Sequence, residues 1–453
     1  MDIRKCDVAI IGAGTAGLHA WKAATKAGAN VLVIERGAGG STCTATGCIP
    51  SKLLIAAGRT AMQARRAATF GIEVGEVGVN GGAVMRWLRA ERDKADGQIR
   101  DEYLRIPDEH RIHGEARFAG PTTLLVGDEL TIQAGAVVIA TGANPIVPPP
   151  LEPVRPLLHT HETIFEIERP PASLAVIGAG PLGLELAQAF ARLGVAVIVL
   201  DKSAAVGALR DPEAEAAARD AIGKGMAIHL GVEVTGAMEG NRARLSWTGD
   251  STGSVVVEMV LAATGRSPAV AGLDLDQVGV PLDDEGVPRF EPDTRRCGDT
   301  QVFVAGDVDG WRPVLHEAAR GGTIAGCVAA GGAAFRPIPP LSIAFTEPNL
   351  VEVGARFNSL PDGAIIGTAK ATENARSGID VEDEGLVRLY ANADGKLLGG
   401  SIVLTGGEHL GQSLALAIDR QMDAALLADQ AWYHPVLEEM LQEAARDIVR
   451  QGG

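Results

Sequence analysis

Two cysteines separated by four residues are the side chains best suited to chemistry in the N-terminal part of the chain. Cys43 and Cys48 lie in the segment STCTATGCIPSK, which begins at Ser41. On a regular helix their side chains would point about 140° apart, so they can bond only if the turn between them is distorted. Gly47 makes such a distortion easier. A small strained ring of this kind should be reducible, so the pair indicates redox chemistry.

The residues that follow favour a thiolate at Cys48. Pro50 suits the first turn of a helix, so Cys48 would lie near a helix N-terminus, where negative charge is stabilised. Lys52 adds a positive charge one turn on. A metal pair is one alternative, but two thiolates need two more ligands, and neither a CxxC pattern nor clustered histidines lie nearby. A pair of buried structural cysteines is the other alternative.

A candidate base lies near the C-terminus. His434 precedes a proline, and Glu439 follows five residues after the histidine. A thiol must lose a proton before it attacks a disulfide, and histidine titrates in the right range, while a carboxylate would orient the imidazole. A histidine beside a proline is more often structural, so position alone does not assign this role. Among the other histidines only His316, in VLHEA, has a comparable partner.

The first part of the chain carries a dinucleotide-binding pattern. Apolar runs at 7–11 and 30–34 flank a helical pattern at 15–26, which predicts a strand, a glycine turn, a helix and a second strand. In such units glycines permit the tight turn, the approach of pyrophosphate and close helix packing, and an acid at the second strand binds ribose. The residues concerned are Gly12, Gly14, Gly17 and Glu35.

The same pattern recurs later, with strands predicted at 174–177 and 195–200 and a helix at 184–193. Its acid, Asp201, favours a free 2′-hydroxyl over a 2′-phosphate, so we expect NAD rather than NADP, although Lys202 is adjacent. Two sites in one chain indicate a tightly held flavin, FAD, and an exchanging nicotinamide. The glycines of this second site are Gly178, Gly180 and Gly183.

The rest of the chain supplies further elements. Asp307 follows a strand-like run and suits a hydrogen bond to a flavin hydroxyl, but it suits a capping role equally well. The proline-rich segment 143–156 predicts an extended connection, and a helix is expected at 313–331. Residues 346–453 read as an α+β domain. The elements expected there are strands at 364–368, 386–390 and 401–404 and helices at 409–420 and 435–449.

Composition limits the possible partners and location. A formal net charge of -16 argues against nucleic acid and against an anionic membrane surface. No apolar run approaches the roughly 20 residues of a membrane span. The apolar start of the chain runs into Gly12, which a strand and its phosphate turn explain better than a signal peptide. We therefore expect a cytoplasmic protein.

With these motifs in view, the chain resembles the class I pyridine nucleotide–disulfide oxidoreductases over essentially its whole length. This group includes dihydrolipoamide dehydrogenase, glutathione reductase and mercuric reductase. The matching segments are the cysteine motif at 43–52, the ATG turns at 140–142 and 263–265, the GD motif at 306–307, the F-T-x-P segment at 345–348, and the terminal pair of His434 and Glu439.

The resemblance implies an α/β fold of the glutathione-reductase type, with two Rossmann-like dinucleotide-binding domains and a C-terminal α+β dimerisation domain. The expected domains are an FAD-binding domain at 1–145, an NAD-binding domain at 146–268, a central domain completing the FAD site at 269–345, and a dimerisation domain at 346–453.

The resemblance also implies individual roles. Cys43 would face the substrate and Cys48 the flavin, and Lys52 would pair with Glu185 near the flavin. His434 and Glu439 would serve the partner subunit's site, which implies a homodimer. The further cofactor-binding residues that it implies are Thr42, Thr141, Gly142, Gly265, Asp307 and His316.

The expected activity is that of a dihydrolipoamide dehydrogenase-like enzyme, with a lipoyl-carrying protein or a small dithiol or disulfide as substrate. Trp432 and Tyr433 precede His434 where such enzymes carry a further histidine, so the usual protein partner is in question. Mercuric reductase is disfavoured because the C-terminus has no cysteine pair, and glutathione reductase is disfavoured by Asp201. Reduction of another disulfide, or electron relay by a flavoprotein, are the alternatives.

Overall fold

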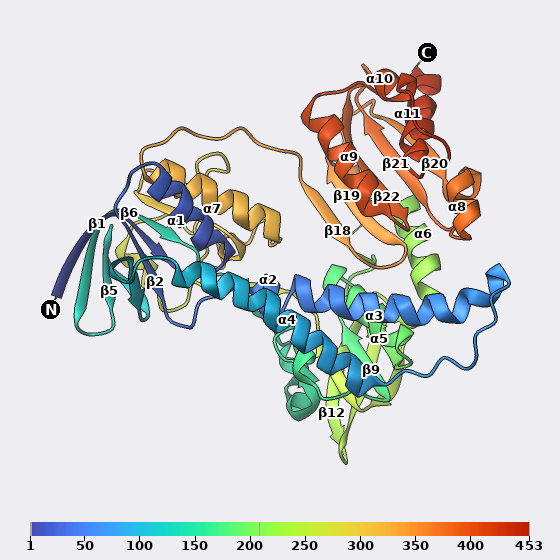
Figure 1. The fold of residues 1–453 in the computed structure, drawn as a ribbon, viewed down its shortest axis with the longest axis horizontal. Coiled ribbons are helices and arrows are strands. Elements are labelled where there is room, and N and C mark those ends of the chain that lie inside the picture. The colour runs from blue at the N-terminus through green and yellow to red at the C-terminus, as the bar shows by residue number, and fades with distance from the viewer. Residues whose placement is uncertain (1, 208, 453) are drawn as a thin grey trace. The chain divides into compact units, whose positions relative to one another are not determined.

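The computed structural model describes residues 2–207 and 209–452 (Figure 1). The chain divides into two compact units, each built from three separate segments. The first unit comprises 1–50, 88–146 and 265–337, and the second comprises 51–87, 147–264 and 338–453. The bounds of the four predicted domains stay predictions, and their outermost residues, Met1 and Gly453, lie outside the described part.

A mostly parallel sheet forms the first unit, in the order β3-β2-β1-β6-β5-β4, with β17 also paired to β6. Residues 8–10 of β1 are completely buried, because both faces of this central strand are covered. Helices α1 and α7 lie side by side (Figure 1). A Cβ at Gly322 or Gly326 of α7 would collide with main-chain oxygens of α1, so only glycine permits this close packing.

The elements of the first unit are as follows, α3 and α4 running from one unit into the other: β1 (Asp2–Ile11), α1 (Thr15–Lys26), β2 (Val31–Glu35), α2 (Thr42–Ala45), α3 (Cys48–Arg66), α4 (Gly81–Leu104), η2 (Asp108–His110), β3 (Arg111–His113), β4 (Ala116–Gly120), β5 (Thr123–Val126), β6 (Leu130–Ile139), β7 (Ala143–Pro145), β16 (Arg266–Pro268), η5 (Leu275–Gln277), β17 (Val302–Val304), η6 (Asp307–Asp309) and α7 (Leu315–Ala329).

The second unit contains a parallel sheet in the order β11-β10-β9-β15-β8, a small antiparallel sheet β12-β13-β14, and an antiparallel sheet in the order β18-β19-β22-β21-β20. Helices α9, α10 and α11 share one apolar core with the last sheet. The parallel sheet has the expected α/β character. The last antiparallel sheet, with its helices, has the α+β character expected for the C-terminal part of the chain.

The elements of the second unit are as follows: η1 (Ala67–Phe70), η3 (Pro149–Leu157), β8 (Leu158–His159), η4 (Ile164–Glu166), β9 (Ser173–Ile177), α5 (Pro181–Arg192), β10 (Ala196–Leu200), α6 (Pro212–Gly223), β11 (Ala227–His229), β12 (Val232–Glu239), β13 (Arg242–Gly249), β14 (Gly253–Val257), β15 (Met259–Ala262), β18 (Leu341–Ala344), β19 (Asn349–Gly354), η7 (Phe357–Ser359), β20 (Ile365–Lys370), η8 (Ala371–Glu373), α8 (Ala375–Asp380), β21 (Leu386–Ala391), β22 (Leu397–Leu404), α9 (Gly407–Asp419), α10 (Ala424–Asp429) and α11 (Glu439–Gly452).

Two sequence predictions are wrong in detail. The segment 143–156 is not extended throughout, because Leu151 and Val154 turn into the core and draw η3 into a 3-10 helix. The last helix begins at Glu439 rather than at 435. The N–H of Val436 donates to the Glu439 carboxylate and its carbonyl accepts from Asn374, so side chains satisfy the main chain there. Within 2–207 and 209–452, no helix is both long and apolar enough to cross a membrane.

A buried polar network joins α6, the helix between β10 and β11, to strand β21 of the five-stranded antiparallel sheet. Asp211 is completely buried and caps α6, accepting from the main-chain N–H groups of Glu213 and Ala214. Its other carboxylate oxygen accepts from Arg388 Nε at 3.0 Å and from the Tyr390 hydroxyl at 2.9 Å. Burial raises the pKa of Tyr390, so the hydroxyl keeps its proton and donates it here.

Replacing Tyr390 with phenylalanine should destabilise the protein. The variant loses the hydrogen bond to Asp211 and a 2.8 Å contact with Ser401, which together are worth about 1–3 kcal/mol. Denaturant unfolding of the FAD-saturated protein measures this change. Tyr433→Phe is the matched control, since Tyr433 is 83% exposed and should leave stability unchanged. Equal stability of both variants and wild type would contradict the role given to the network.

Candidate active site

A tight turn connects the two cysteines. Cys43 is the second residue of the short helix α2, and Cys48 is the first residue of α3. A Cβ at Gly47 would lie 2.8 Å from the Thr42 carbonyl oxygen and 3.2 Å from the Cα of Cys43, so glycine allows the chain to fold back over Cys43. Both cysteines are half-buried. The chain between the cysteines therefore departs from a regular helix, as the sequence predicts for a pair that could bond.

Side chains from elsewhere in the first unit hold α2 in place. The Ser41 hydroxyl accepts from the main-chain N–H of Cys43 at 3.2 Å and lies 2.7 Å from the Thr15 hydroxyl at the start of α1. The Thr44 hydroxyl donates to Asp96 of α4 at 2.9 Å. Asp96 is buried, yet nothing in the sequence around it singled it out. These contacts tie the helix that carries Cys43 to both α1 and α4.

One helical turn after Cys48, Lys52 forms the ion pair expected from the sequence. Its ammonium lies 2.8 Å from Glu185 Oε2 and 4.4 Å from the centre of the Phe345 ring. Glu185 is buried, and its other oxygen accepts from the Phe345 main-chain N–H at 2.8 Å. Both carboxylate oxygens are thus paired, as a buried charge requires. Phe345 was predicted only as part of a family motif, and its contact with Lys52 was not foreseen.

His434 and Glu439 are also brought together. His434 Nδ1 lies 3.0 Å from Glu439 Oε1, and the imidazole side chain is 68% exposed. Burial alone would raise the pKa of Glu439, but hydrogen bonds from His434 and Val436 outweigh it and lower that pKa. The carboxylate therefore stays ionised and orients an imidazole whose other face is open to a substrate or a second subunit.

The two glycine loops share one geometry. Gly12 and Gly178 have positive φ angles, and a Cβ on either would collide with a carbonyl of the neighbouring strand's end. Gly17 and Gly183 likewise have no room for a Cβ, because each lies against the carbonyl of the first glycine in its own loop. Main-chain packing therefore requires the first and third glycines of each fingerprint.

The second glycines differ. A Cβ at Gly180 would meet no atom of the described residues within 4 Å, and at Gly14 its nearest neighbour would be the Gly40 oxygen at 3.8 Å. Among the described residues nothing requires a glycine at either position, which leaves space for a ligand's phosphates. Gly14 and Gly180 are the N-caps of α1 and α5, and neither helix has a side-chain cap. Both loops thus fit a dinucleotide pyrophosphate at a helix N-terminus.

The two acids occupy equivalent places. Glu35 accepts from the main-chain N–H groups of Ala13 and Gly37, at 2.7 Å each. Asp201 accepts from Ala179 and, at 2.7 Å, from Ser203. Each acid therefore lies directly beside its own glycine loop, where its carboxylate could accept a hydrogen bond from a ribose hydroxyl of a bound dinucleotide.

The remaining predicted cofactor residues lie in the first unit. Asp307 pairs with Arg266 at 2.5 Å, and the Thr141 hydroxyl donates to the Ala269 carbonyl at 2.7 Å. His316 is exposed in the first turn of α7, a helix that also has no side-chain cap. Gly142 and Gly265 have positive φ angles, and Thr42 opens α2 with its side chain exposed. Their cofactor contacts stay predictions.

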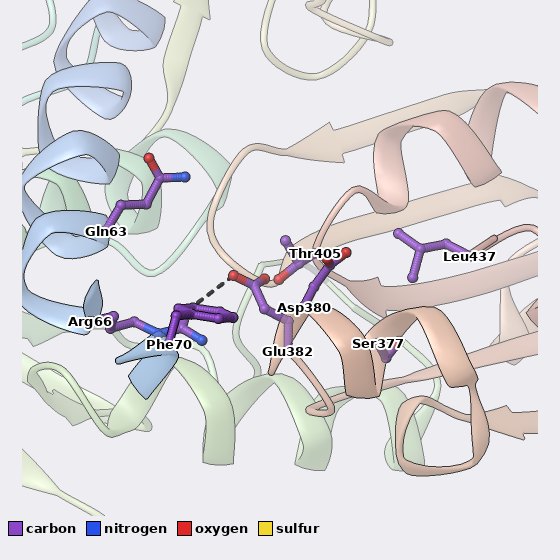
Figure 2. Close-up of a pocket in the computed structure, with 8 residues that line it drawn as sticks. All are labelled: Gln63, Arg66, Phe70, Ser377, Asp380, Glu382, Thr405 and Leu437. Carbon is purple, nitrogen blue, oxygen red and sulfur yellow. Dashed lines mark hydrogen bonds and ion pairs between the residues drawn. The ribbon is translucent and has the colours of Figure 1, made fainter. Parts of the chain in front are cut away.

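A cavity of about 300 Å³ lies in the second unit and is lined in part by the C-terminal end of α3 (Figure 2). Arg66 and Glu382 face each other across it in an ion pair of 3.0 Å. Leu437 lines this cavity and also a neighbouring one of about 190 Å³. Leu437, between His434 and Glu439, therefore lies in the walls of both cavities, a feature with no signal in the sequence.

Comparisons with known proteins agree with this geometry. The family described as pyridine nucleotide-disulphide oxidoreductase matches residues 6–322, and its dimerisation domain matches 341–445. A dihydrolipoyl dehydrogenase of Halobacterium salinarum is 30% identical over 97% of this chain and 95% of its own length. A mercuric reductase of Shigella flexneri is 32% identical over 97% of this chain and 80% of its own.

Solved structures share the fold. LpdA of Mycobacterium tuberculosis superimposes with a TM-score of 0.83 at 24% identity, over 98% of this chain and 99% of its own. The HOCl-induced flavoprotein disulfide reductase RclA of Escherichia coli gives 0.82 at 21% identity, over 97% and 99%. The expected glutathione-reductase-like fold, with two Rossmann-like domains and a dimerisation domain, is confirmed.

Gly180→Ala should separate binding from folding. The added methyl meets no atom of residues 2–207 and 209–452 but fills the space expected for pyrophosphate, so the Kd for NADH should rise about tenfold or more while the thermal midpoint stays that of wild type. Fluorescence titration and thermal unfolding measure the two effects. Gly183→Ala is the contrasting variant and should lower the midpoint. Unchanged NADH affinity in Gly180→Ala would argue against the site.

The pKa of Glu439 should respond to His434. Its folded-state value lies below the ordinary 4.5, so the stabilisation from the pair is complete above that value and is lost as the pH falls through the lowered pKa. In His434→Gln, NMR titration of the Glu439 side-chain carboxyl should show the pKa moved upward, towards 4.5. An identical titration in wild type and variant would show that the imidazole does not act on this carboxylate.

Proposed function

Since the chain belongs to the pyridine nucleotide-disulphide oxidoreductase family, we propose that it moves electrons between a dihydrolipoyl dithiol and NAD through Cys43, Cys48 and FAD. As a flavoprotein oxidoreductase of this class it uses FAD and NAD(H). The observation that carries the proposal is the turn at Gly47, which folds the chain back over Cys43 and brings Cys48 to the first residue of α3.

The unequal positions of the cysteines support unequal roles. Cys43, on the short helix α2, is the sulfur that a substrate thiol attacks. Cys48 is released as a thiolate at the N-terminus of α3, where the helix dipole stabilises negative charge. Attack forms a mixed disulfide between substrate and Cys43, and the second substrate thiol then displaces Cys43, which leaves both cysteines reduced. Bound FAD supplies the carrier for the electron pair between these cysteines and NAD.

The partner subunit's His434 is assigned as the base for this exchange. It removes the proton from the attacking thiol, and Glu439 stabilises the resulting imidazolium at 3.0 Å. The match to a dimerisation domain supports a homodimer, in which a histidine so far along the chain can serve a second copy's cysteines. A lipoyl-carrying protein or a small dithiol as substrate, and a cytoplasmic location, remain predictions from the sequence.

Individual residues of the chain distinguish between the proposed activity and other activities within the family. Two relatives are named mercuric reductases, but the last cysteine of this chain is Cys327, so residues 328–453 carry no cysteine pair to bind a mercuric ion. A reductase of another disulfide would use the same cysteines and base. An electron-relay flavoprotein would not need Cys43. Asp201 beside the second glycine loop supports NAD over NADP.

Three variants test the proposal. Dihydrolipoamide-dependent NAD+ reduction should be abolished in Cys43→Ser and fall about 10²–10⁴-fold in His434→Gln, the range for losing a general base. NADH oxidation by ferricyanide, which bypasses the cysteines, should persist in both. The matched control is Cys327→Ser, outside the proposed site, with wild-type turnover expected.

The outcomes distinguish the candidates. Full dihydrolipoamide activity in Cys43→Ser would refute the disulfide mechanism and favour electron relay. No dihydrolipoamide activity in wild type, together with NADH-dependent reduction of another disulfide, would keep the mechanism and replace the substrate.

A further inference from the structure

Arg295 occupies an unusual position in the first unit. It is only 2% exposed, and its backbone adopts a left-handed conformation with φ of +61°. A long side chain is disfavoured there, and such strain persists where the surroundings hold the residue in place. A buried and strained arginine outside the proposed catalytic set therefore calls for a specific role.

The surroundings of Arg295 are shaped to its guanidinium group. Nη1 donates to Asp309 Oδ2 at 2.6 Å, and both side chains are at most 5% exposed. The guanidinium carbon lies 5.0 Å from the centre of the Phe290 ring and 5.5 Å from that of Trp311. On the α7 side the neighbour is Gly321, where a Cβ would come within 3.1 Å of that carbon. The pocket thus accommodates a planar cation between two rings and a glycine.

Asp309, the carboxylate paired with Arg295, links this pocket to the predicted flavin site. Asp309 closes the single 3-10 turn η6 that Asp307 opens. Asp309 Oδ1 accepts from the main-chain N–H of Trp311 at 2.9 Å, and its own N–H donates to the Gly306 carbonyl at 2.8 Å. The main chain of Asp309 therefore closes the turn towards Gly306, its carboxylate fixes the following residue Trp311, and Arg295 is the cation that holds this carboxylate.

The electrostatics make Asp309 dependent on this cation. Burial raises the pKa of Asp309, while the N–H of Trp311 and the charge of Arg295 oppose that rise. Asp307 in the same turn adds a repelling charge and is held separately by Arg266. A buried carboxylate left without its cation is costly, so loss of Arg295 should rearrange the turn.

We propose that Arg295 is a positioning residue for the flavin site, which fixes, through Asp309, the turn that presents Asp307 to a ribityl hydroxyl of FAD. The proposal rests on the FAD of the proposed function and on the predicted role of Asp307. It is independent of the thiol substrate. Arg295 acts on the flavin half of FAD, whereas the loop at Gly14 would hold its pyrophosphate.

Arg295→Asn provides the test, because asparagine tolerates the left-handed backbone but lacks the guanidinium group. The apoprotein is titrated with FAD, and ADP is then measured as a competitor of FAD. ADP lacks the ribityl group, so it reports the glycine loop alone. The Kd for FAD should rise about tenfold, as expected for loss of a charged hydrogen-bond anchor, while the inhibition constant of ADP stays unchanged.

Companion variants keep the test decisive. Asp309→Asn, and the double variant Arg295→Asn with Asp309→Asn, should raise the Kd for FAD to the same extent as Arg295→Asn, since all three break one pair. In the double variant no buried carboxylate is left without its cation, so misfolding caused by an unpaired buried charge is avoided. Arg117→Asn is the matched control, because its pair with Asp274 at 3.6 Å is exposed, and wild-type affinity is expected.

Three results would overturn the proposal. An unchanged Kd for FAD in Arg295→Asn would show that the turn needs no such anchor. Equal weakening of FAD and ADP would mark general loosening rather than positioning. Unchanged FAD affinity in Asp307→Ala would remove the premise. None of these readouts uses a dithiol, so failure of the proposed dihydrolipoyl activity leaves them untouched.

Discussion

Main-chain contacts too close for a Cβ atom determine where this chain can do chemistry. Gly47 folds the chain back over Cys43, and Gly17 and Gly183 bring helices α1 and α5 against the turns that precede them. Glycines in α7 allow it to pack directly against α1. At each place a methyl group would force the main chain apart. The close packing of turns and helices at these places therefore depends on glycine.

The same constraint explains which parts could be read from the sequence. Glycine spacing and apolar periodicity are local signals, and the predicted helix at 15–26 coincides with α1. The pair Lys52–Glu185 could be named because a family resemblance supplied it. The pair His434–Glu439 could already be named because a histidine and a carboxylate five residues apart suit a base and the group that orients it. The structure places the paired side chains within 3.0 Å of each other. Long-range contacts gave no such signal: the pairing of Thr44 with Asp96 spans 52 residues.

Other differences come from competition for main-chain hydrogen bonds. The C-terminal helix was predicted to start at 435, but the Glu439 and Asn374 side chains take the hydrogen bonds of Val436. The apolar residues Leu151 and Val154 draw a proline-rich segment into the core. Arg295, with Asp309 and two aromatic rings around it, was invisible in sequence because its burial depends on residues that surround it only after folding.

The central claim is that Cys43 and Cys48 form the pair that NADH reduces. Differential alkylation, with peptide mass spectrometry before and after anaerobic NADH, tests it most directly. Burial raises the pKa of Cys6 to about 11 and of Cys297 to about 12, so these thiols should remain unlabelled throughout. The account predicts that Cys43 and Cys48 become labelled together only after NADH. Labelling of both before NADH, or of neither after it, would contradict the account.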